Sequence, residues 1–81
     1  MSKYLKSASS VRTGRKFIRA RHKLGLSLEE VKNVTYINQN YINAIEKGDY
    51  SDFPSEAFAK AYFKKYANLL KINPLFPRSE E

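Results

Sequence analysis

Apolar residues recur along most of this chain with the three- and four-residue spacing of amphipathic helices, and no stretch shows the alternation of a β-strand. The first helical segment, VRTGRKFIRARHKLG, has its inward-facing positions at Val11, Phe17, Ile18, Leu24 and the alkyl stem of Arg21. Gly25 ends it, because glycine readily adopts the left-handed conformation that closes a helix. The pattern predicts a first helix over residues 11–24, preceded by a flexible, basic, serine-rich segment at residues 1–10.

Two short helices joined by a tight turn follow. Ser27 opens the sequence SLEE, a capping box in which the side chains of Ser27 and Glu30 each bond the other's backbone N–H, and this predicts a helix over 28–33. Asn38 can cap the next helix, over 39–47, because its side-chain oxygen can accept from N–H groups of the first turn. The inward-facing positions of that helix are Tyr41, Ile42 and Ile45.

A longer helix completes the domain. Ser55 caps it, it reaches about Lys71, and the residue before Pro74 ends it because that residue avoids helical geometry. Residues 74–81 then form a tail. The chain is therefore predicted to be one all-α domain over residues 11–73, a bundle of four or five helices.

Composition argues against several functional classes. The chain has 81 residues, no cysteine and a single histidine, His22, which lies among cations without a second ligand at metal-binding spacing. Catalytic triads, HExxH, glycine-rich phosphate loops and EF-hand loops are all missing from the sequence. It also lacks an apolar run of transmembrane length and the apolar core of a signal peptide. We therefore expect a soluble, cytoplasmic binding domain, with no enzymatic activity, metal, cofactor or small-molecule substrate.

Charge is unevenly distributed within the net +7. Residues 1–26 carry eight Lys or Arg and no acid, residues 27–55 have an excess of acids, and residues 56–81 have a small excess of cations. This asymmetry favours an anionic partner such as nucleic acid or a lipid surface, although a solubilising basic face has the same composition.

Two stretches resemble known families. GRKFIRARHKLGLSLEEV followed by TYINQNYINAIEKGDY resembles the lambda-repressor-like helix-turn-helix class. The continuation GDYSDFPSEAFAKAYFKKYANLL is similar to the cytoplasmic domain of RodZ-like bacterial cell-shape proteins, and the resemblance covers about residues 14–72. It implies an adaptor that binds the actin-like filament protein MreB, in a parent protein anchored in the inner membrane by a transmembrane segment beyond residue 81.

One candidate working surface is a DNA-reading face on the helix over 39–47. Asn and Gln pair bidentately with adenine in the major groove, and the amides in this region are Asn38, Gln39, Asn40 and Asn43. Arg15 and Arg19 of the first helix, with Arg21, would hold phosphates. Against this reading, the helix over 39–47 has no arginine, and DNA-binding relatives usually have Gln where this chain has Leu28.

The other candidate surface lies on the last helix, in AFAKAYFKKYANLL. Its apolar arc is about 180° wide, broader than the stripe of about 100° with which a surface helix packs on a core. The half containing Phe63 suffices for packing, which leaves Phe58, Tyr62 and Tyr66 for a partner or, alternatively, for the core. The resemblance implies that Tyr62 and Tyr66 bind MreB, with Lys65 and Lys64 facing an acidic patch on the filament.

Two further expectations concern the rest of the chain. The basic amino-terminal segment is a third candidate surface, for anionic membranes. Tyr36 lies in the turn after the second helix, where many relatives have Gly, and a left-handed backbone there would be strained by about 1–3 kcal/mol.

Overall fold

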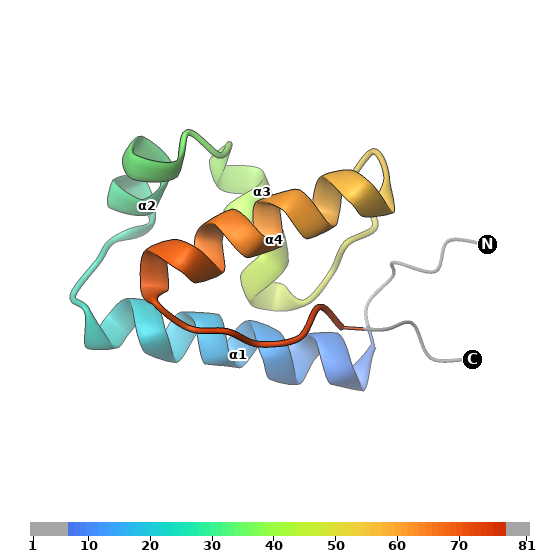
Figure 1. Cartoon of the computed structure of the whole chain (residues 1–81), viewed down its shortest axis with the longest axis horizontal. Coiled ribbons are helices and arrows are strands. Elements are labelled where there is room, and N and C mark those ends of the chain that lie inside the picture. Colours follow the sequence, from blue (N-terminus) through green and yellow to red (C-terminus); the bar gives the residue numbers. More distant parts are fainter. Residues whose placement is uncertain (1–6, 78–81) are drawn as a thin grey trace.

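A computed structural model describes residues 7–77 and contains four helices without a strand in that range. The helices are α1 (Ala8–Lys23), α2 (Leu28–Thr35), α3 (Gln39–Lys47) and α4 (Glu56–Leu70). Figure 1 shows α1 along one edge of the molecule, α2 and α3 on the other side, and α4 lying across α3. The predicted all-α helix-turn-helix fold is confirmed, with α2 and α3 joined by the turn at residues 36–38.

The predicted caps of α2, α3 and α4 are all present. Ser27 and Glu30 form the capping box, at 2.8 and 3.1 Å. Asn38 and Ser55 accept from backbone N–H groups in the first turns of α3 and α4. Helix α2 extends two residues beyond its predicted end at Asn33, because the buried Thr35 hydroxyl donates to the Val31 carbonyl and accepts from the Ile37 N–H.

The predicted flexible segment at residues 1–10 is wrong for its last four residues. Ser7 caps α1, and its side chain accepts from the Ser10 N–H while the Ser10 hydroxyl accepts from the Ser7 N–H. Ser10 is buried because its hydroxyl also donates to the carbonyl of Gly48, at 2.5 Å. The first helix therefore starts at Ala8 and is tied to the end of α3, whereas residues 1–6 lie outside the described part.

Two glycines allow the backbones of α1 and α3 to touch. A Cβ on Gly14 would lie 2.3 Å from the carbonyl oxygen of Glu46. Gly48, which ends α3 with a φ of 74°, would place a Cβ 2.4 Å from the Ser10 carbonyl oxygen. The carboxyl-terminal end of α3 is therefore pressed against the amino-terminal half of α1.

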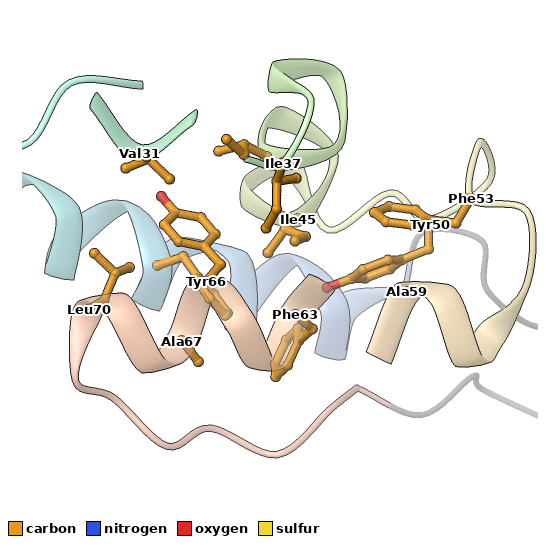
Figure 2. Packing of buried hydrophobic residues seen from close by; sticks show 12 residues of the cluster. Val31, Ile37, Ile45, Tyr50, Phe53, Ala59, Phe63, Tyr66, Ala67 and Leu70 are labelled. Atoms are coloured by element: carbon orange, nitrogen blue, oxygen red, sulfur yellow. The ribbon is translucent and has the colours of Figure 1, made fainter. Parts of the chain in front are cut away.

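The core lies where α4 packs on the other helices, and Figure 2 shows side chains of α4 meeting those of α2, α3 and the loop after α3. Phe17 is at its centre, with ring centroids 4.9 Å from both Phe63 and Tyr66. The fully buried aliphatic side chains are Val31, Ile37, Ile42 and Ile45. Full burial of each contributes about 1.5–3 kcal/mol relative to exposure, so these residues hold the helices in one arrangement.

The predicted tail at residues 74–81 is wrong in its first part. Lys71 adopts a left-handed conformation with a φ of 60°, and the chain then runs back along α1, as Figure 1 shows. Phe76 packs against Tyr50 and Phe63, with centroids 5.3 and 5.1 Å away. The domain thus continues past residue 73 to Phe76, because this ring covers one side of the core.

We expect Gly14→Ala to lower the free energy of unfolding by about 2 kcal/mol or more, because α1 must move away from the Glu46 carbonyl. Urea denaturation measures the loss. Gly25→Ala is the matched control, since a Cβ there meets nothing within 4 Å and only the positive φ opposes it, by about 1 kcal/mol. Equal losses for the two variants would contradict the close approach of α1 and α3.

Candidate partner-binding surface

Tyr66 lies in the core, so its predicted role as a surface anchor is wrong. Its side chain is 0% exposed, and Figure 2 shows the ring pointing from α4 into the interior. Its hydroxyl donates to the carboxylate of Glu46, itself only 8% exposed. A buried carboxylate needs such a donor, and this requirement fixes the orientation of Tyr66.

Arg21 completes a buried cluster with Glu46 and Tyr66. Its guanidinium donates to both Glu46 oxygens, from Nε at 2.7 Å and from Nη2 at 3.2 Å, and its Nη1 donates to the Leu26 carbonyl at 3.0 Å. The hydrogen bond to Glu46 raises the pKa of Arg21. Because Glu46 and the Leu26 carbonyl hold its guanidinium, Arg21 points inward and not, as the sequence had predicted, toward a phosphate backbone.

Two buried tyrosines hold their protons strongly. Burial, together with the hydrogen bond to Glu46, raises the pKa of Tyr66 well above its ordinary value. Burial alone raises the pKa of Tyr50, whose hydroxyl has no hydrogen-bond partner among the described residues. Both side chains therefore act as neutral core residues.

Phe58 and Tyr62 lie instead in a partly exposed aromatic cluster between α3 and α4. The aromatic cluster consists of Tyr41, Phe53, Phe58 and Tyr62. The Tyr62 ring is 4.5 Å from Phe58 and 5.6 Å from Tyr41, and all three are half-buried. Phe53 is buried beneath them, 4.7 Å from Tyr41. The cluster thus offers a rigid apolar surface with the polar tips of two tyrosines.

The two candidate lysines of α4 point in different directions. Both Lys64 and Lys65 are exposed. At 100° per residue, Lys65 is about 60° around the helix from Tyr62, whereas Lys64 is about 160° away. Only Lys65 therefore flanks the aromatic cluster.

The candidate amide residues lie at the start of α3, on either side of Tyr41 in the sequence, and therefore close to the aromatic cluster. Asn38, Gln39 and Asn40 are exposed and Asn43 is half-buried. The Asn38 side-chain oxygen is already used to cap α3, by accepting from the Asn40 N–H at 2.8 Å. A groove beside these amides is lined by Asn38, Asn40, Tyr41, Asn43, Ala44, Lys47, Asp49 and Asp52. With two carboxylates and one cation along its wall, the groove suits a phosphate backbone poorly.

Arg15 and Arg19 are exposed on α1, but the structure does not bring them to the amides. Helix α1 meets the carboxyl-terminal end of α3 at Gly14, whereas the amides occupy the beginning of α3. The two sets of candidate DNA-binding residues therefore do not meet at the same end of α3.

Tyr36 has the left-handed backbone expected for the turn, with a φ of 60°. Its side chain is 86% exposed, so no packing within the described residues accounts for the conformation. The geometry instead closes α2, since the Tyr36 N–H bonds the Lys32 carbonyl at 2.8 Å.

Sequence reasoning missed three features of this region. It left Glu46 and Tyr41 out of the candidate residues, and it assigned Phe76 to a tail. The signal for Glu46 was its position one turn after Ile42 and next to Ile45, on the inward side of α3. The pairing of Glu46 with Tyr66 joins residues 20 apart, which a local pattern does not reveal.

The two short helices α2 and α3, set against α1 and α4, define a small helix-turn-helix domain. The Helix-turn-helix domain family matches residues 17–75, and the chain belongs to this family. A protein named "Uncharacterized membrane protein YmfM" from Bacillus subtilis (strain 168) is 29% identical over 48 residues. These are 59% of this chain but only 17% of the length of that relative. Comparison with solved structures gave no significant match.

Residues 7–77 contain neither a membrane-spanning helix nor a cluster of metal ligands. No helix there combines the length and apolar character needed to cross a bilayer. No group of three His, Asp or Glu side chains in this range could hold a metal ion.

Tyr66→Phe tests the buried cluster. We expect it to lower the free energy of unfolding by about 1–3 kcal/mol, because the Glu46 carboxylate loses a donor where water cannot replace it. Chemical denaturation gives the value. Tyr62→Phe is the matched control, expected within about 0.5 kcal/mol of wild type. If the two variants behave alike, the Tyr66 hydroxyl does not stabilise Glu46.

Alkaline pH should destabilise the domain through its buried tyrosines. Folding raises the pKa of Tyr50 and Tyr66, so their contribution is present in full below the ordinary pKa of 10.0. Above it the unfolded chain loses these protons first, and stability falls by about 1.4 kcal/mol per pH unit for each residue. Denaturation between pH 9 and 11.5 should show a shallower fall for Tyr50→Phe than for the exposed control Tyr36→Phe. Identical slopes for the two variants would contradict a raised pKa of Tyr50 in the folded domain.

Proposed function

We propose that this domain is the cytoplasmic adaptor of a RodZ-like cell-shape protein, which binds the actin-like filament protein MreB and links it to the membrane. The observation that carries the proposal is the partly exposed aromatic cluster at the seam of α3 and α4, with Lys65 beside it. Tyr62 and Phe58 are the proposed anchors, and Tyr66 supports them from the core.

Protein interfaces concentrate their binding energy in a few well-packed aromatic and cationic side chains. Tyr62 meets this description, since its ring is held by Phe58 and Tyr41 before any partner arrives. Little side-chain entropy is then lost on binding. Lys65 adds a charge that can face an acidic patch.

A link to the membrane is supported by the relative named as a membrane protein. The matched region is 17% of that protein, so the proposed parent would hold its membrane-spanning segment outside the helix-turn-helix domain. The domain would then be the part that reaches the filament.

DNA binding is the second candidate function, supported by the exposed amides of Gln39 and Asn40 at the start of α3. The acidic side chains along the adjoining groove and the absence of arginine from α3 favour the protein partner.

Cosedimentation with polymerised MreB tests the proposal. We expect Tyr62→Ala to weaken binding by about thirtyfold, the loss typical of a hot-spot residue. Lys65→Glu should weaken binding, and Lys64→Glu should not, because only Lys65 flanks the cluster. Circular dichroism controls for folding of each variant.

Two results would overturn the proposal. One is equal binding by wild type and Tyr62→Ala. The other is no filament binding by wild type together with a DNA duplex complex that Gln39→Ala abolishes, which would make α3 the working surface.

A further inference from the structure

The outward side of α1 carries a row of five exposed cations. These are Arg12, Arg15, Lys16, Arg19 and Lys23. The opposite side of the helix holds its buried residues, Ser10, Thr13, Gly14 and Phe17. The sequence of α1 contains no acid, and the five cations form no ion pair with any described carboxylate. The positive face spans residues 12–23 of α1 and is therefore about 18 Å long.

The segment that follows α4 runs beside this face and carries an exposed apolar residue. Residues 72–77 run back along α1 in Figure 1, and Ile72, Asn73 and Pro74 line a shallow depression together with Lys16 and Arg19. Phe76 anchors the segment in the core, whereas its neighbour Leu75 is 88% exposed. Leu75 is therefore free to enter an apolar environment without disturbing the core.

We propose that this face of α1, together with Leu75, docks on the surface of an anionic lipid bilayer. Lysine and arginine near such a surface are attracted to the headgroup phosphates, and a leucine gains free energy by entering the interface. A straight helix can bring all five cations to a flat bilayer at the same time. A phosphate backbone gives the exposed Leu75 nothing to bind, whereas a bilayer interface takes up apolar side chains.

The proposed membrane face and the aromatic cluster can be occupied together. The cluster packs around Tyr41 in the first turn of α3, whereas α1 meets the opposite end of α3 at Gly14. A domain lying on lipid through α1 would therefore leave Tyr62 accessible. The lipid proposal goes beyond filament binding and does not depend on it.

Flotation of the 81-residue chain with lipid vesicles tests the proposal. The vesicles are equimolar phosphatidylglycerol and phosphatidylcholine, with pure phosphatidylcholine as the uncharged comparison. We expect binding only to the anionic vesicles, with a partition coefficient that falls steeply between 50 and 500 mM salt, conditions chosen to span strong and weak screening. No binding to anionic vesicles at the lower salt would overturn the proposal.

Charge-reversal variants locate the surface. Arg15→Glu with Arg19→Glu should reduce partitioning at least about thirtyfold, since each cation near an anionic surface contributes about fivefold. Lys32→Glu with Lys64→Glu changes net charge by the same amount at exposed sites on α2 and α4, and should reduce it much less. Equal losses for the two pairs would show that only net charge matters and would overturn the proposal.

Leu75→Ser distinguishes lipid from nucleic acid. We expect it to weaken vesicle binding by about threefold or more and to leave the salt dependence unchanged, because it removes an apolar contact and no charge. Folding is checked by thermal denaturation, which an exposed side chain should not shift. Full vesicle binding by Leu75→Ser, with a short DNA duplex displacing wild type from the vesicles, would identify nucleic acid as the occupant and overturn the lipid proposal.

Discussion

The arrangement of this domain depends on one buried carboxylate. Glu46 projects from the last turn of α3 into the interior, where Arg21 of α1 and Tyr66 of α4 both donate to it. Removing a single partner from a buried ion pair leaves an uncompensated charge and is strongly destabilising. Since Gly14 lets the α1 backbone reach the Glu46 carbonyl as well, this one residue sets the position of α3 against both long helices.

The buried cluster also decides which side chains remain for a partner. Tyr62 and Tyr66 are one turn apart on α4, yet Tyr66 is held by Glu46 while Tyr62 lies at the seam with α3. On α1, Arg21 turns inward in the same way, and Arg15 and Arg19 stay outside. Two tyrosines or two arginines that look equivalent in the sequence can therefore lie one in the core and one on the surface, depending on which of them reaches Glu46.

The helix starts could be predicted from local hydrogen bonds, whereas the burial of individual side chains depends on contacts between residues distant in the sequence. Ser27 with Glu30, Asn38 and Ser55 cap their helices through bonds within three residues, which the sequence displays directly. Tyr66 is held in the core by Glu46, 20 residues away in the sequence. Phe76 is held there by Tyr50 and Phe63. The width of the apolar arc on α4 left open whether its aromatic residues face a partner or the core, and it could not separate Tyr66 from Tyr62, which are about 40° apart around the helix.

The aromatic residues connect the end of the domain to its candidate filament surface. Phe76 contacts Tyr50, Tyr50 contacts Phe53 at 5.3 Å, Phe53 contacts Tyr41, and Tyr41 contacts Tyr62. Close-packed rings transmit displacement because a shift of one leaves a void or a clash at the next. The segment after α4 is thus linked to Tyr62 through packed rings, and the loop between α3 and α4 supplies two of them, Tyr50 and Phe53. Phe76 also contacts Phe63, the residue next to Tyr62 on α4.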